Sequence, residues 1–136
     1  MNNHELQIVT IEQAKKLKEL GFDWRVDLVF ASETDHHNQT RKGMLYGTKG
    51  FRNSADRGDS DYAAPTVALA LKWIMDDGRR VLYCIDYHWN KIWQFSWRFS
   101  HSKGDRQGYY YDTYEAAESA LLDAILETME GNDDQK

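Results

Sequence analysis

Cys84, Asp86 and His88 are the residues whose types and spacing come nearest to a nucleophilic site. A thiol with an imidazole beside it is the minimum for nucleophilic catalysis, and alternate residues of a strand share one face. However, Cys84 and His88 would lie about 13 Å apart on a strand, too far for a direct hydrogen bond unless His88 folds back in a turn. The pattern therefore favours a small buried cysteine, an aspartate at the sheet rim and a histidine in a turn. A small hydrolase or thiol enzyme using Cys84 and His88 is a second alternative.

Metal and cofactor chemistry finds little support in the sequence. Asp35, His36, His37, His88 and His101 show neither the His-x₃-His spacing of a helical zinc site nor a cysteine partner. Residues 56–61, DRGDSD, lack the glycine and glutamate positions of a calcium loop, and the glycines match no phosphate-binding loop. The prediction is no metal and no cofactor.

The elements that would position such residues centre on residues 80–100. Trp93, Phe95, Trp97 and Phe99 alternate with polar residues, as in a strand with one buried face. The preceding residues 81–87 are rich in β-branched and aromatic types, and a short connection at 88–91 predicts a hairpin. We expect this hairpin to form the centre of the sheet, with helices on its aromatic face.

Helix signals place three helices around the hairpin. Thr10 and Gln13 form a capping-box pattern, and Gly21 follows as a stop signal. Pro65 suits the first turn of a second helix that runs to about residue 77. Residue 112 or 113 caps a third helix, with Glu115 in its first turn and Gly131 at its end.

Further strands are expected at residues 24–30, at 44–46 and, as a short edge strand, at 109–111. In the first, Trp24, Val26, Leu28 and Phe30 form the buried set. The strand at 44–46 would pair back on the first through a turn near residues 36–39. Because a loop of about 30 residues without structure is uncommon inside a compact domain, we expect this short strand within the region, followed by a mobile stretch at residues 49–61.

The prediction is one α+β domain over residues 1–136. It has an antiparallel sheet of three to five strands with three helices packed mainly on one face. The order is helix, strand, an optional short strand, helix, strand, strand, helix. Residues 1–9 and 131–136 are expected to be loose termini, and residues 32–61 a polar, partly mobile insertion.

Charge is distributed unevenly along the chain. The net charge is −5, and residues 107–135 contain eight acidic residues and no Lys or Arg. These acids predict an outward acidic face on the third helix, which could meet a basic surface of a partner protein. The candidate binding residues are Glu115, Glu118, Asp123, Glu127 and Glu130. A solvated helix face without a partner is the plainer interpretation.

Single-stranded nucleic-acid binding is the first alternative. Cations that track phosphates next to rings that stack on bases form a single-strand platform. The candidate residues are Arg98, His101, Lys103 and Arg106, interleaved with Trp97, Phe99 and the tyrosines at 109–111. Against this alternative, Trp97 and Phe99 belong to the face assigned to the core, and the net charge is negative.

Three stretches carry a resemblance: TIEQAKKLKELGFDW at residues 10–24, YAAPTVALALKW at 62–73 and YDTYEAAESALLDAIL at 111–126. Together they resemble small uncharacterised proteins encoded in phages and mobile elements of gut bacteria. The shared motifs are a helix stop, a helix-starting proline and a helix cap, over about a third of the chain. This chain departs from that pattern at Ala116 and Ala117. The resemblance implies an accessory protein of a mobile element and assigns no site.

The function expected from the sequence is a non-enzymatic, cytoplasmic accessory protein that binds another protein. No stretch is apolar enough to cross a membrane, and the N-terminus lacks an apolar signal core. A homodimer through the edge strand at 109–111 is a further expectation, because an unpaired edge can pair across a two-fold axis.

Overall fold

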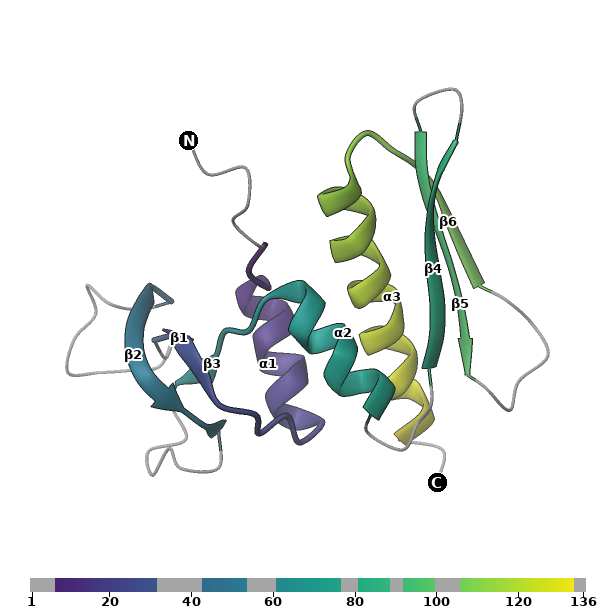
Figure 1. Cartoon of the computed structure of the whole chain (residues 1–136). Coiled ribbons are helices and arrows are strands. Elements are labelled where there is room, and N and C mark those ends of the chain that lie inside the picture. The colour runs from purple at the N-terminus through teal and green to yellow at the C-terminus, as the bar shows by residue number, and fades with distance from the viewer. Residues whose placement is uncertain are drawn as a thin grey trace. The chain divides into compact units, whose positions relative to one another are not determined.

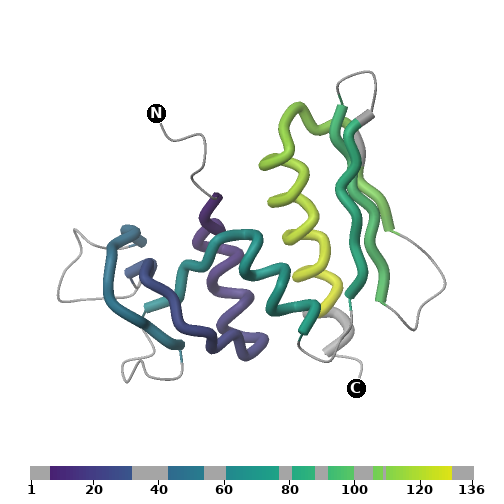
Figure 2. Tube along the Cα trace, in the orientation of Figure 1, coloured from purple at the N-terminus to yellow at the C-terminus, as the bar shows by residue number. Residues whose placement is uncertain are grey.

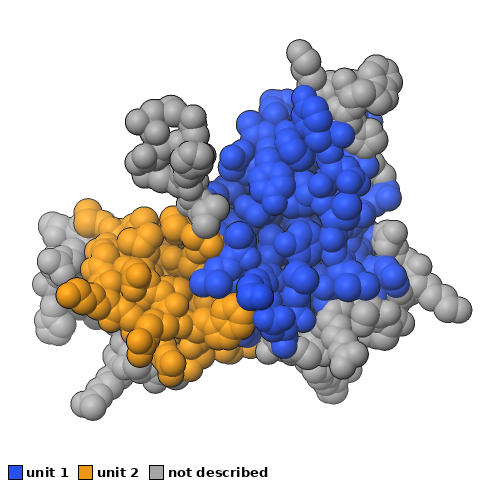
Figure 3. Space-filling model, in the orientation of Figure 1, with its two compact units in different colours: residues 1–7, 67–136 blue, residues 8–66 orange. Residues whose placement is uncertain are grey.

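The computed structural model describes residues 7–31, 43–53, 61–76, 81–88, 92–99 and 106–133. At His88, at Tyr109 and from residue 130 to 133, only the backbone is described. The chain divides into two compact units, residues 8–66 (unit 2) and residues 1–7 with 67–136 (unit 1), which Figure 3 shows in separate colours. Each unit contains one three-stranded antiparallel sheet.

The elements of unit 2 are α1 (Ile11–Glu19), β1 (Val26–Phe30), β2 (Leu45–Phe51) and β3 (Tyr62–Ala63). Those of unit 1 are α2 (Val67–Asp76), β4 (Val81–His88), β5 (Ile92–Phe99), β6 (Arg106–Tyr111) and α3 (Tyr114–Asp133), all labelled in Figure 1.

The capping box predicted for the first helix is confirmed. The Thr10 hydroxyl accepts a hydrogen bond from the Gln13 backbone N–H at 3.1 Å, and the Gln13 side chain accepts one from the Thr10 N–H at 2.9 Å. These bonds satisfy two backbone donors that the helix leaves unpaired. Gly21 follows the helix at φ +100°, a conformation that favours glycine.

The sheet of unit 2 has the order β2-β1-β3, so the predicted pairing of the second strand with the first is confirmed. An irregularity between Val26 and Leu28 shifts the register of β1 and β2. Opposite this point, the Asp27 carboxylate accepts a hydrogen bond from the Gly50 N–H. The irregularity buries Val29 together with Val26, so the predicted strict alternation was wrong here.

The stretch predicted to be mobile, residues 49–61, is ordered where the structure describes it. Strand β2 continues to Phe51, and Asn53 is buried. The Asn53 amide donates to the Phe22 carbonyl at 2.9 Å and accepts from the Ala63 N–H at 3.0 Å. Asn53 thus ties the end of α1 to β3 across the unit. The turn expected near residues 36–39 and residues 54–60 lie outside the described residues.

The N-terminal segment also differs from the prediction. Ile8 forms a β-bridge with Thr66, and the Val9 N–H donates to the Pro65 carbonyl at 3.0 Å. Val9 is buried, so the loose terminus does not extend to residue 9. Pro65 precedes α2 instead of occupying its first turn, because α2 begins at Val67.

In unit 1 the sheet has the order β4-β5-β6, which confirms the hairpin and the edge strand near residue 110. The expectation that the hairpin forms the centre of the sheet was wrong for its first strand, because β4 is an edge strand. Helix α3 lies along one face of this sheet (Figures 1 and 2) and contacts β5 and β6 most extensively. Phe95, Trp97 and Phe99 point to that face and are buried, as their alternation predicts. The opposite face carries no helix of this unit within the described residues.

Strand β6 and helix α3 each depart from the prediction in one detail. β6 contains a bulge where its register with β5 shifts, and there Tyr110 adopts φ +71°. Such bulges twist an edge strand and make it a poorer template for pairing. Helix α3 continues through Gly131 to Asp133, because a glycine at this point is tolerated at a modest cost in helix stability.

The α+β class with three helices is therefore confirmed, whereas the expectation of one continuous sheet was wrong. β1 and β3 pair in one sheet and β4, β5 and β6 in another. The single domain over residues 1–136 stays a prediction, since the compactness of each unit does not establish whether either folds alone.

Candidate functional site

Cys84 is exposed on β4, so the predicted burial of this cysteine was wrong. The strand alternates, and Tyr83 takes the side toward α3 while Cys84 takes the uncovered side. The Cys84 thiol donates a hydrogen bond to the Asp86 carboxylate at 3.1 Å. This hydrogen bond, followed by partial desolvation and the Asp86 charge, raises the pKa of the Cys84 thiol. The arrangement therefore disfavours the thiolate, which is the nucleophilic form.

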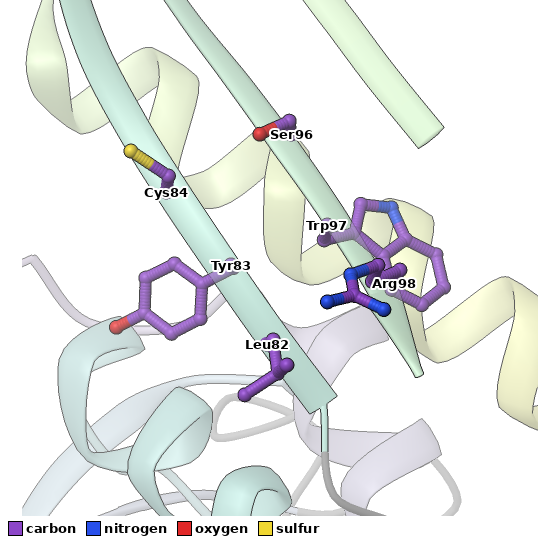
Figure 4. Close-up of a pocket in the computed structure, with 6 residues that line it drawn as sticks. All are labelled: Leu82, Tyr83, Cys84, Ser96, Trp97 and Arg98. Atoms are coloured by element: carbon purple, nitrogen blue, oxygen red, sulfur yellow. The ribbon is translucent and has the colours of Figure 1, made fainter. Parts of the chain in front are cut away.

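A shallow hollow of about 190 Å³ lies on the sheet around Cys84 (Figure 4). Three cross-strand pairs line it: Leu82 with Arg98, Tyr83 with Trp97, and Cys84 with Ser96. The lining includes neither an imidazole nor a carboxylate that could act as a base. The side chain of His88 lies outside the described residues. The hollow thus brings a thiol and a hydroxyl together, and the one described carboxylate bonded to the thiol, that of Asp86, lies outside the lining and raises the thiol pKa.

The acidic face of α3 is present with fewer members than predicted. Glu115, Asp123 and Glu127 are exposed. At 100° per residue, their positions span about 120° around the helix axis, so they share one side. Glu118 was assigned to the same face, and this is wrong, since only 7% of it is exposed. The side chain of Glu130 lies outside the described residues.

Glu118 instead lies on the buried side of α3, near two phenols. The Tyr114 hydroxyl donates to the Glu118 carboxylate at 3.3 Å. Burial raises the pKa of Glu118, the Tyr114 hydrogen bond opposes this, and the charge of Glu115 adds to it. Burial and the nearby carboxylates raise the pKa of Tyr114 to about 12, and burial with the Glu118 charge raises the pKa of Tyr83. Both phenols therefore stay neutral at physiological pH.

The rings of the nucleic-acid alternative are exposed to different extents, because Tyr110 is 78% exposed whereas Trp97 and Phe99 are buried. Arg98 is partly exposed on the uncovered side of β5, whereas the Arg106 guanidinium lies 4.9 Å from the Trp97 ring and 5.8 Å from the Phe99 ring. Trp97 and Phe99 are buried, so neither offers a face on which a base could stack. His101 and Lys103, like His36 and His37, lie outside the described residues.

Sequence analysis missed a group of aromatic residues at the end of the sheet where α3 begins. The Tyr87 and Trp93 rings, which form a cross-strand pair, have centroids 4.7 Å apart. The Tyr114 ring stands at 80° to Trp93, with centroids 5.3 Å apart. The pairing of Tyr87 with Trp93 follows from the hairpin register and could have been found. The approach of Tyr114 depends on how α3 packs, which no local pattern reveals.

No helix in the described part of the chain is long and apolar enough to span a membrane. Comparisons with protein-family models, with curated proteins and with solved structures found no match for this chain.

Proposed function

We propose that this chain is a non-enzymatic accessory protein that binds a basic surface of a partner protein through the exposed acidic residues of α3. The observation that carries the proposal is the position of Glu115, Asp123 and Glu127 on one side of a helix whose other side is buried. The resemblance to small phage and mobile-element proteins supports an accessory role, carried out in the cytoplasm of the cell that makes the protein.

The electrostatics of this helix favour association with a cation-rich partner. No Lys or Arg occurs in residues 107–135, so all the formally charged side chains of this segment are acidic. Single-sign surfaces of this kind steer oppositely charged partners and raise association rates. Because exposed charges are screened, the complex should weaken as the salt concentration rises.

The experiment is a capture assay with the tagged full chain in a lysate of the producing cell. It is run at about 0.1 M and about 1 M salt, between which the Debye length falls from about 10 Å to about 3 Å. A triple variant, Glu115→Gln with Asp123→Asn and Glu127→Gln, removes the acidic face. The matched control, Glu12→Gln with Glu19→Gln and Asp76→Asn, changes net charge equally with helical acids elsewhere, which are exposed.

We expect the parent protein and the control variant to capture a partner protein, and nuclease treatment to leave this capture unchanged. Capture should be lost at high salt and with the triple variant of the acidic face. Equal capture by both triple variants would show that overall charge, and not this face, drives binding. Capture that disappears with nuclease would favour the nucleic-acid alternative.

A further inference from the structure

The rings of Tyr87, Trp93 and Tyr114 form a cluster that is partly exposed to solvent. Tyr87 is 53% exposed and Tyr114 is 39% exposed, whereas Trp93 is partly buried. By contrast, Phe95 and Trp97, farther along β5, are buried under α3. Because the three rings meet at 52° and 80°, their faces point in different directions instead of stacking on one another.

Two carboxylates act on one ring of the cluster, that of Tyr114. Glu118 lies one helical turn after Tyr114 and accepts a hydrogen bond from the Tyr114 hydroxyl. The charges of Glu118 and Glu115 both raise the pKa of Tyr114. No described Lys or Arg lies over any of the three rings. The two carboxylates together outweigh the roughly half positive charge that the N-terminus of α3 contributes.

An electron-rich ring face attracts a cation within about 6 Å, and the attraction grows when the cation is desolvated. A buried carboxylate such as Glu118, which has no basic partner among the described residues, provides the compensating charge for such a cation. A compact ammonium can satisfy one carboxylate and lie against several rings. A guanidinium instead presents five donors in a planar fork, for which this site offers too few acceptors.

We infer that Tyr87, Trp93 and Tyr114, with Glu118 beside them, form a site for the ammonium group of a lysine side chain on the partner protein. The inference rests on the proposed function and names the group on the basic partner that this end of unit 1 recognises. The aliphatic stem of the lysine contacts the exposed Tyr87 ring, and the ammonium lies over the rings next to Glu118. N-methylation of the lysine keeps the charge and enlarges the surface in contact with the rings.

The test uses defined small probes on the full chain, read by calorimetry and by nuclear magnetic resonance shifts of the Trp93 indole. The probes are N-acetyl-lysine methylamide, its N-trimethyl form, and the norleucine analogue, which has a similar shape and no charge. Both cationic probes should bind and shift the Trp93 signal, and the neutral analogue should not. Tighter binding of the trimethyl probe would identify a methylated lysine as the preferred form, and tighter binding of the plain probe an unmodified one.

Two variants separate the site from its surroundings. Glu118→Gln, which keeps the shape of the side chain, and Tyr87→Leu, which removes an exposed ring, should each weaken binding of the cationic probes by at least about fivefold. Glu12→Gln, the same change in the first turn of α1, should leave binding within about twofold. Circular dichroism spectra like that of the parent protein verify that each variant is folded.

Equal binding of the neutral and cationic probes, or binding unaffected by Glu118→Gln and Tyr87→Leu in folded protein, would overturn the inference. Failure here is distinguishable from failure of the proposed function. If the partner is captured through Glu115, Asp123 and Glu127 while the lysine probes do not bind, the acidic face stands and the aromatic site does not.

Discussion

Both units place aromatic rings next to charged side chains, but the charges have opposite signs. In unit 2 the Tyr62 ring has the Lys15 ammonium 6.0 Å and the Lys18 ammonium 5.3 Å from its centroid, and Lys18 also donates to the Asp61 carbonyl. In unit 1 the cluster of Tyr87, Trp93 and Tyr114 has carboxylates beside it and no described cation over it. The first arrangement is complete within the chain. For the second, as inferred above, we expect a cation from another molecule.

The largest expected effect is on the free energy of unfolding when a buried ring is replaced, compared with the replacement of an exposed ring. Trp97→Ala removes a ring that is 1% exposed and covered by Arg106, and should cost about 3–5 kcal/mol of unfolding free energy. Tyr87→Leu removes a ring that is half exposed and should cost less than about 1 kcal/mol. Urea denaturation measures both. Similar large losses would show that the Tyr87 ring is structural, which would weaken the distinction.

A smaller effect, an increase in the free energy of unfolding, is expected when Glu118 is replaced. Burial raises the pKa of Glu118, so the folded state binds a proton more readily than the unfolded chain. Stability should therefore fall as pH rises from the unfolded pKa to the raised folded pKa, and remain reduced above it. Glu118→Gln removes the buried charge and should stabilise the free protein near pH 7 by on the order of 1 kcal/mol.

Besides burial, Tyr114 and Glu115 from α3 act on the pKa of Glu118, and the Glu118 charge in turn raises the pKa of Tyr83 from β4. Because both phenols stay neutral near pH 7, the loss of stability as pH rises above the unfolded pKa of Glu118 should be smaller in Glu118→Gln than in the parent protein. Denaturation at several pH values tests this. An unchanged pH profile would show that burial does not raise the pKa of Glu118.

The smallest effects concern the cations that the chain supplies itself. Lys18→Gln removes a cation from the Tyr62 ring, and Arg106→Gln removes one from Trp97 and Phe99. Each should cost about 0.5–1 kcal/mol, the usual value of an exposed cation–π contact. Lys72→Gln is the control, because Lys72 forms only a surface ion pair with Asp76 at 4.0 Å. Losses no larger than the control would mean that these cations cover the rings without stabilising them.

The bulge in β6 affects the edge strand through which a homodimer is expected to form. The edge strand proposed for a homodimer exists, but Tyr110 at φ +71° interrupts its regular pairing surface. Light scattering should distinguish a chain of 15.9 kDa from a particle of twice that mass. The homodimer stays a prediction until that mass is known.

Much of the fold follows from local patterns. The capping box at Thr10 and the alternation of Phe95, Trp97 and Phe99 depend only on nearby residues and the physical rules for helices and strands. The burial of Val29 does not follow from such patterns, because it depends on an irregularity opposite Gly50, far away in the sequence. The separation into two sheets likewise depends on which strands meet, which alternation alone does not specify.

The candidate site was less predictable, for two different reasons. Glu118 precedes the buried Leu121 and Leu122 by three and four residues, so helical spacing already placed it on the buried side. The prediction nevertheless assigned all the acidic residues of this helix to one exposed face. The exposure of Cys84, however, depends on which side of the sheet α3 covers, and the contact of Tyr114 with Trp93 depends on the same packing. Neither can be obtained from the strand pattern alone.

The exposed Cys84 also makes the chain convenient for single-site labelling. It is the sole cysteine in the sequence, so a maleimide dye or spin label would attach at one known point without any substitution. That point is three residues from Tyr87 along β4 and on the opposite face of the strand, so a probe there could report on occupancy of the aromatic cluster without lying in it. Because the hydrogen bond to Asp86 keeps the thiol protonated, labelling proceeds best at mildly alkaline pH.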